Sequence, residues 1–418
     1  MSQESIPFYI CVPFVVILLL IALMPLALPH WWEKNRNKGI VAFVASLPVF
    51  LFLVVKFPSE LLATFYDYLS FIVLLASLFI ISGGILIQGN LKATPLVNTV
   101  FLLIGAVIAN VIGTTGASML LIRPMLRTNS ERRHTIHIPV FFIFVVSNLG
   151  GCLTPLGDPP LFLGYLRGVP FTWTLGLFPE WLTAVGIVLA VFYIWDSIAF
   201  KKENYLDLIQ DIARKELLTI KGKINLLFLL VVVLAVFGAK TPYRELIMVA
   251  ATILSLVFTG KQVRSDNQFT FNPIIEVAVL FAGIFVTMVP LLMLLAEKGA
   301  SLGITEPWQF FWLTGGLSSF LDNAPTYLTF SSLAASVTAA GHAGAQTVAG
   351  IDPNLLRAIS CGAVFMGANT YIGNGPNFMV KSIAEEQGMK VPHFFQYMLY
   401  SGLILIPTFL LITLIFFK

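Results

Sequence analysis

The chain has 418 residues, of which 57% are hydrophobic and 11% charged, and its formal net charge is +4. Soluble globular domains are roughly 45–50% apolar and about 25% charged, so this composition excludes a soluble domain and indicates a polytopic membrane protein. So small a charge gives no reason to expect a nucleic-acid partner, and the lipid bilayer is the first partner to expect. Cys11, Cys152 and Cys361 lie far apart in apolar runs, which suits neither a disulfide framework nor a metal site.

Eight continuous apolar stretches have about the length of a membrane-spanning helix. In chain order they are 7–28, 39–56, 66–88, 174–200, 223–239, 243–259, 272–297 and 396–417. The first is preceded by no Lys or Arg and has no small-residue cleavage pattern, which predicts a retained span. Four further apolar stretches are interrupted by small and polar residues, namely 96–128, 136–168, 308–342 and 355–389.

We interpret 96–128 and 308–342 as re-entrant hairpins, and 136–168 and 355–389 as broken helices that cross the membrane. Both termini then lie on the same face. With that face outside, on the periplasmic side of the inner (plasma) membrane, 18 of the 25 Lys and Arg residues fall inside. This agrees with the positive-inside rule and makes 201–222 a cytoplasmic linker.

The linker separates two similar halves, 1–200 and 223–418. The string "TPLGDPPLFL" (154–163) aligns with "TYIGNGPNFM" (370–379). Each half has three crossings, a hairpin, a broken helix and a last span. Because five crossings is an odd number, the second half starts from the opposite face. We therefore predict an all-α polytopic membrane protein with an inverted repeat of five crossings and one re-entrant hairpin each, the usual plan of secondary transporters.

The aligned strings contain the two helix breaks. Proline lacks an N–H group and disfavours the α conformation of the residue before it, so we expect Asp158 and Pro159 to leave the helical region. Carbonyl groups freed by a break cannot face lipid, so each break must lie in protein or in a watery cavity. Half-helix ends and free carbonyls near the midplane can bind a small ion. A simple proline kink is the alternative.

Asp158 and Asp322 are the two carboxylates predicted to lie deep in the membrane. An aspartate at the centre of a membrane helix costs roughly 2.5–3.5 kcal/mol on insertion scales, so such residues usually serve an ion pathway. Burial favours the protonated carboxyl and a bound cation favours the ionised form. We therefore predict that a proton and a transported sodium ion compete for these acids. A buried structural pair or a polar cap is the alternative, and Asp322 is placed to cap the helix arm that follows it.

Hydroxyl and amide side chains near the same interruptions supply neutral oxygens, which suit hard cations. They are Asn110, Thr114 and Thr115 in the first hairpin, Asn148 and Thr154 in the first broken helix, Asn323 in the second hairpin, and Asn369, Thr370, Asn374 and Asn377 in the second broken helix. Each could instead form a hydrogen bond between helices.

The other ionisable groups are expected near the surface. Glu180 and Asp196 fall near the ends of one predicted span, which favours a solvated or interfacial position. His134 and His137 are expected in a wet basic loop, where they could sense pH. The chain has no ATP-binding loop, nucleophile elbow or metalloprotease motif, so we expect neither an enzyme nor a cofactor beyond transported sodium and protons.

The strings "SNLGGCLTPLGDPP", "LDNAPTYL" and "GANTYIGNGPN" resemble the ion transporter superfamily. Within it they look like the NhaD-type sodium/proton antiporters and neighbouring citrate-transporter-like proteins, over nearly the whole chain in segment order. The resemblance implies a homodimer and a substrate site between hairpin tips and broken helices. It assigns ion-site roles to Asn148, Thr154, Asp158, Asn374 and Asp322. Pro159 and Pro160 stand where NhaD-like proteins tend to have small or hydroxyl residues, and this resembles the arsenite and citrate branches more.

No Lys or Arg falls at the predicted hairpin tips. Like charges repel strongly in a low-dielectric site, so two acids favour an inorganic cation over citrate. The sequence therefore predicts a sodium (lithium)/proton antiporter. The alternatives are a sodium- or proton-coupled carrier of citrate, a dicarboxylate or arsenite, and, from a different class, a passive ion channel.

Overall fold

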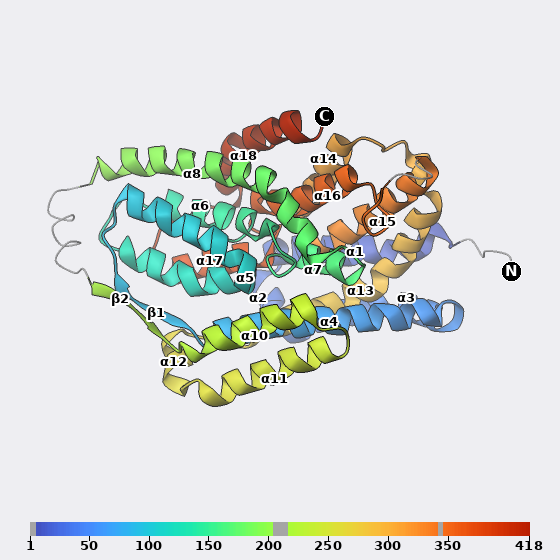
Figure 1. The fold of residues 1–418 in the computed structure, drawn as a ribbon, viewed down its shortest axis with the longest axis horizontal. Helices are drawn as coiled ribbons and strands as arrows, with labels where there is room; N and C mark the ends of the chain where they lie inside the picture. The colour runs from blue at the N-terminus through green and yellow to red at the C-terminus, as the bar shows by residue number, and fades with distance from the viewer. Residues whose placement is uncertain (1–5, 204–215, 342–345) are drawn as a thin grey trace.

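The computed structural model describes residues 6–203, 216–341 and 346–418, and its helices run mainly along the long axis of the molecule (Figure 1). Residues 1–5, most of the predicted linker (204–215) and residue 342 of the second predicted hairpin lie outside the described residues. Seven helical segments of the described chain are long and apolar enough to cross a membrane. At this level the prediction of an all-α polytopic membrane protein is confirmed.

The helices follow the predicted order. Those of the first half are α1 (Val12–Ala27), α2 (Pro29–Trp32), α3 (Asn35–Lys56), α4 (Pro58–Ser82), α5 (Pro95–Thr128), α6 (His137–Val145), α7 (Pro159–Leu166) and α8 (Phe178–Phe200). Those of the second half are α10 (Ile224–Gly238), α11 (Tyr243–Phe258), α12 (Lys261–Asp266), α13 (Asn272–Lys298), α14 (Pro307–Ser318), α15 (Asn323–Gly341), α16 (Pro353–Met366), α17 (Gly375–Glu386) and α18 (Phe394–Phe416). Short 3-10 turns precede both restarting helices of the broken segments, η2 (Leu149–Cys152) before α7 and η5 (Gly367–Asn369) before α17.

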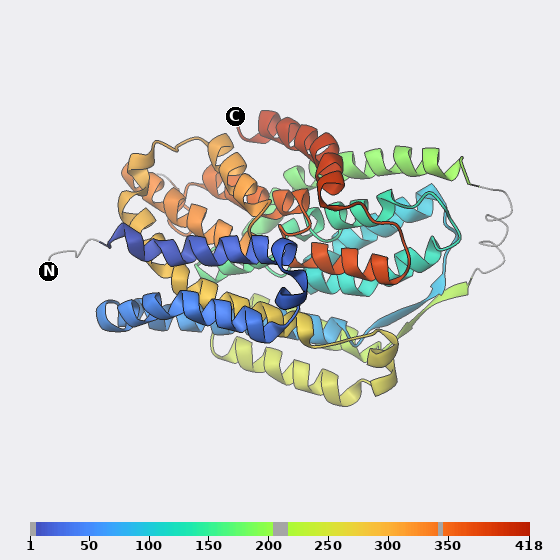
Figure 2. The same cartoon turned by 180° about the vertical axis from the view of Figure 1, so that it is seen from behind.

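Helices of both halves of the chain pack against the broken segments. Seen from behind, α1 and α3 lie along α13 (Figure 2). Helix α6 is buried along its whole length, so protein rather than lipid surrounds the first broken segment. The outer helices α3, α8, α10, α11 and α18 carry many exposed large apolar side chains, as lipid contact requires.

A two-stranded ribbon departs from the all-α prediction. The predicted span 66–88 ends at Ser82 of α4, and strand β1 (Leu86–Asn90) follows it. β1 pairs antiparallel with β2 (Glu216–Lys221), the last part of the predicted linker, with Ile87 opposite Ile220. The sequence analysis missed this ribbon because β1 continues an apolar run and its partner is far away in the sequence.

Both segments predicted as hairpins turn back on themselves. α5 reverses at Gly113, whose φ of 79° is open to glycine and strained for other residues. The two ends of α5 lie side by side: the side chains of Asn98, near its start, and Asn129, just after its end, exchange hydrogen bonds of 2.9 and 3.0 Å. α14 and α15 are separated by the turn 319–322 and pack against each other.

A buried polar cluster joins the base of α5 to α8. Asp196 Oδ1 accepts a hydrogen bond from Arg132 (2.6 Å) and lies 2.8 Å from His137 Nε2, while Asn98 donates to Oδ2 (2.9 Å). All four residues are buried. The expected solvated position of Asp196 and wet-loop position of His137 are therefore wrong, because these partners offset the cost of taking the charges out of water. His134 is exposed, as expected.

Glu180 is a second buried acid that we expected at the surface. It is 1% exposed, and Arg357 of α16 lies 2.7 Å from its carboxylate. This charged partner offsets the cost of burying Glu180. Because Arg357 comes from the other half of the chain, the sequence around Glu180 does not indicate that the acid is buried.

We predict that Asp196→Asn lowers the free energy of unfolding by about 3 kcal/mol, because it leaves the buried guanidinium of Arg132 without its nearest carboxylate. Unfolding by SDS in mixed micelles measures the change. The control is Glu385→Gln, which removes an exposed ion pair with Lys381 and should cost less than about 1 kcal/mol. Equal losses in the two variants would contradict the assignment.

Candidate functional site

The two broken helices restart in the same way. Asp158 precedes α7 with φ −144° and ψ 145°, and Asn374 precedes α17 with φ −150° and ψ 141°. A proline stands in the first turn of each restarting helix, where the missing N–H costs nothing. The expectation that Pro159 leaves the helical region is wrong: it is the first residue of α7, because its fixed φ suits that position.

The chain approaches itself closely at both breaks. A Cβ on Gly157 would collide with the carbonyl oxygen of Gly151, and a Cβ on Gly373 would lie 2.6 Å from that of Gly367. Both contacts are with backbone, which cannot move aside as a flexible side chain would. Each break therefore requires glycine at the position before the acid or amide.

Each break is also fixed to a hairpin by a threonine. Thr154 donates to the carbonyl of Asn110 (2.5 Å) in the first hairpin, and Thr370 donates to the carbonyl of Ser319 in the second. In both cases the same hydroxyl accepts an N–H from two residues further on, at 3.2 and 3.3 Å. Thr154 and Thr370 thus hold the breaks against the hairpin tips.

Side chains satisfy many of the carbonyl groups that the breaks release. The donors are Trp181 and Thr174 at the first break, and Asn377, Tyr397 and Ser401 at the second. These bonds meet the requirement that backbone in a membrane be satisfied within the protein. They also occupy carbonyls that we expected to be free for an ion.

Asp158 lies where both hairpins and the second broken helix meet. It is 1% exposed, and its Oδ1 accepts hydrogen bonds from Thr114 (2.8 Å) and Asn374 (3.4 Å). Its Oδ2 accepts one from Asn323 (2.7 Å). In the described chain, no hydrogen bond or ion pair joins Asp158 to a lysine or arginine. The carboxylate is therefore held by neutral donors alone.

These four residues form two matched pairs. Asp158 and Asn374 occupy the aligned position in the two breaks. Thr154 of the first break binds Asn110, and Thr370 of the second break binds Ser319. Thr114 comes four residues after Asn110, and Asn323 comes four residues after Ser319. The site is thus formed by one residue from each break and one from each hairpin, at matching positions.

Amide and hydroxyl groups surround this centre. Asn148 accepts from Asn374 (3.2 Å) and donates to Asn377 (2.7 Å). Ser318 donates to the amide oxygen of Asn323 (2.8 Å). All of these side chains are buried. The sequence analysis missed Ser318, although a hydroxyl residue just before the hairpin tip was the available signal.

The structure places the other predicted site residues around this centre rather than in it. Asp322 is half-buried and accepts the N–H of Ala324 (3.1 Å), so it caps α15 instead of binding Asp158. Thr115 is half-buried, and its side chain forms no hydrogen bond with a described residue. The remaining ones contact the backbone or side chains of a hairpin or break: Asn110, Thr154, Asn369, Thr370 and Asn377.

A protein-family profile described as "Putative citrate transport" matches residues 3–417. The chain belongs to this family. The match agrees with the citrate-transporter-like part of the resemblance and supports membrane transport rather than catalysis; it does not single out the NhaD-type antiporters. No curated protein matches the chain.

We predict that Gly157→Ala and Gly373→Ala abolish transport and lower the yield of folded protein, because overpacking against rigid backbone cannot be relieved. The control is Gly375→Ala, close to Gly373 in the same break, where an added Cβ meets nothing within 4 Å. Size-exclusion profiles and transport by purified protein measure the effect. Normal folding of Gly157→Ala would show that the close approach is not required.

Proposed function

We propose that this protein is a secondary active transporter in which sodium or lithium ions and protons compete for Asp158. One observation carries the proposal: a fully buried carboxylate lies at the meeting point of two hairpins and two helix breaks, and its hydrogen-bond partners among the described residues are all neutral. An ionised carboxylate without a counter-charge is costly in such a place. Binding either a proton or a metal ion removes that cost.

The partners of Asp158 suit both states. Thr114, Asn323 and Asn374 donate hydrogen bonds to the carboxylate, which suits its ionised form. Rotation of the threonine hydroxyl, or of an asparagine amide, would present an oxygen to a bound cation instead. Hard cations prefer oxygen ligands, so the same three side chains can serve sodium. Asn148 would position Asn374 for this exchange.

The matched contacts of the two halves support the inverted repeat and, with it, alternating access. Rocking of one repeat-related bundle against the other opens a midplane site to each face in turn. We extend the proposal to the first hairpin (96–128) and the second (308–342), which would open from opposite faces. The distribution of Lys and Arg favours both termini on the outer side of the inner membrane, and we propose a homodimer on the resemblance alone.

We predict that Asp158→Asn abolishes the response of proteoliposomes to sodium or lithium. Vesicles with an imposed pH gradient and a fluorescent pH probe should show cation-evoked dequenching with the native chain and none with the variant, because an amide cannot exchange a proton for a cation. The control is Asp352→Asn at the start of α16, where Asn is as good a helix cap as Asp and transport should persist. Full activity of Asp158→Asn would remove Asp158 from the mechanism.

The family match favours a second candidate, the carriage of a citrate-class organic anion together with a cation. An anion cannot approach an ionised Asp158 without repulsion, so a proton or sodium would have to bind first. In the same vesicles, this candidate predicts that citrate evokes proton or sodium uptake and that neither cation exchanges without it. Cation-evoked dequenching in the absence of citrate supports antiport. Rapid ion flux without coupling would contradict both and indicate a channel.

A further inference from the structure

Two pockets adjoin beside the loop between α5 and α6, far from Asp158. The larger has a volume of about 450 Å³ and is lined by Leu126 and Arg127 at the end of α5, by Ser130, Arg132, Arg133 and Thr135 of that loop, and by residues 387–390 after α17. The smaller, of about 270 Å³, extends from residues 133–137 over the end of α8. Both are lined by Arg133, Thr135 and Lys390, so they adjoin, and we refer to the two together as the hollow.

The lining of this hollow is positive. Arg127, Arg132, Arg133, Lys202 and Lys390 line it together with His134, and no Asp or Glu is among the described residues of either wall. Two acids beneath the hollow are covered: Asp196 is 0% exposed beneath Arg132 and His137, and the fully buried carboxylate of Glu203 accepts the N–H groups of Arg133 and His134. The exposed lysine and arginine residues of the lining are Arg127, Arg133, Lys202 and Lys390.

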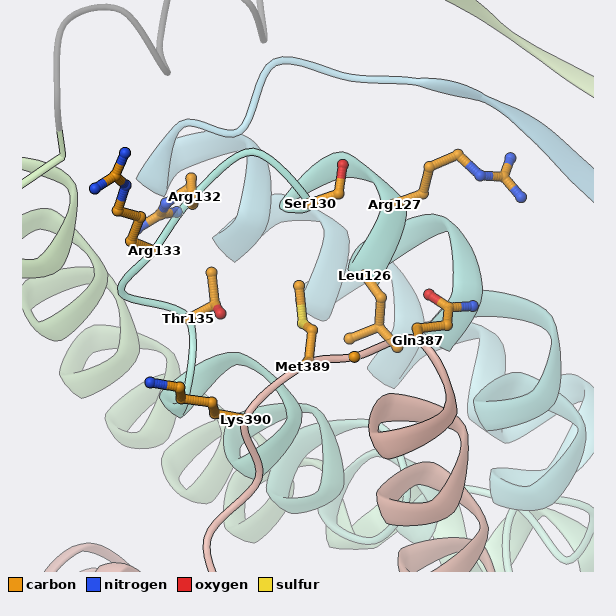
Figure 3. Close-up of a pocket in the computed structure, with 10 residues that line it drawn as sticks. Leu126, Arg127, Ser130, Arg132, Arg133, Thr135, Gln387, Met389 and Lys390 are labelled. Carbon is orange, nitrogen blue, oxygen red and sulfur yellow. The ribbon is translucent and has the colours of Figure 1, made fainter.

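The close-up of the larger pocket shows how its cations are arranged (Figure 3). Arg132 and Arg133 stand at one edge and the amine of Lys390 points toward that side, while Arg127 stands at the opposite edge. Leu126, Thr135 and Met389 lie between them. The cationic rim is formed by Arg127, Arg133 and Lys390, because Arg132 is buried and already paired with Asp196.

The smaller pocket connects this rim to a surface of the kind that faces lipid. Its wall includes Trp195 and Ile198 of α8. Ile198 is 53% exposed, and Ile194, one turn earlier on the same helix, is 60% exposed. Cations above an exposed apolar helix face match a phosphate headgroup above its acyl chains.

We propose that this hollow binds an anionic phospholipid, with its phosphate between Lys202 and Lys390 and its acyl chains along α8. Basic pockets at the end of membrane helices bind such headgroups, and each Lys or Arg near the surface adds attraction. A soluble phosphate would use the cationic rim but gain nothing from Trp195 and Ile198. This inference does not depend on which ion or anion the protein transports.

The position of the hollow would let a bound lipid link the ends of α5 and α17. Its walls are at the far ends of two helical segments, the part of α5 that starts at Thr114 and α17, which follows Asn374. Thr114 and Arg127 are 13 residue steps apart, as are Asn374 and Gln387, which is about 20 Å at 1.5 Å per residue. A lipid bound there would hold together the outer ends of two helices whose inner ends contact Asp158.

The test is lipid binding to the purified full chain, measured by native mass spectrometry from a neutral detergent. We expect cardiolipin and phosphatidylglycerol to bind and phosphatidylcholine and glycerol phosphate to bind much more weakly. Lys202→Gln with Lys390→Gln should weaken binding of the anionic lipids about fivefold per lysine, roughly thirtyfold together.

The matched control is Lys240→Gln with Lys261→Gln, two exposed lysines outside the hollow, which should leave lipid binding unchanged. Equal binding of phosphatidylcholine, or of glycerol phosphate, would overturn the proposal, the latter by showing that the hollow is a site for soluble anions. Equal losses in the two double variants would also overturn it, because the attraction would then be one of overall charge.

Discussion

A helix that stops inside a membrane must find partners for its backbone within the protein, and this constraint organises the structure around the two breaks. The glycines let the chain approach itself, and side chains such as Asn377 and Tyr397 cover released carbonyls. Thr154 and Thr370 bind the breaks to the hairpins. The hairpin tips consequently lie against the breaks, which brings Thr114 and Asn323 onto Asp158.

Two buried aspartates show how partners decide what an acid can do. Asp196 lies beside a guanidinium and an imidazole, so its charge is already compensated and it holds α5 and α8 together. Asp158 is equally buried, but its hydrogen-bond partners in the described chain are a hydroxyl and two amides. Neutral donors orient a carboxylate without neutralising it. This difference is why we assign the proposed exchange of a proton for a cation to Asp158.

Structural features that depend on neighbouring residues in the chain could be predicted from the sequence. Apolar length placed the helices, and glycine with proline placed both breaks. The similarity of the two strings indicated that Asp158 and Asn374 are equivalent, and in the structure their side chains are in contact. Features that depend on distant partners could not be predicted: the β1–β2 ribbon and the burial of Asp196 and Glu180. The capping of α15 by Asp322 is a local contact, and the sequence did offer it as an alternative. The hydropathy of a sequence does not show which acidic side chain will pair with which basic side chain in the fold.

The two aligned breaks differ at the position of the acid, which is Asp158 in one and Asn374 in the other, and that asymmetry matters for the proposed exchange. Two aspartates at the aligned position would repel each other at hydrogen-bonding distance, whereas Asn374 donates to Asp158 instead. The pocket is thus left with a single negative charge among its hydrogen-bonded partners. A proton and a sodium ion each carry one positive charge. Exchange of one for the other through Asp158 alone would therefore move no net charge, and the membrane potential would not drive it.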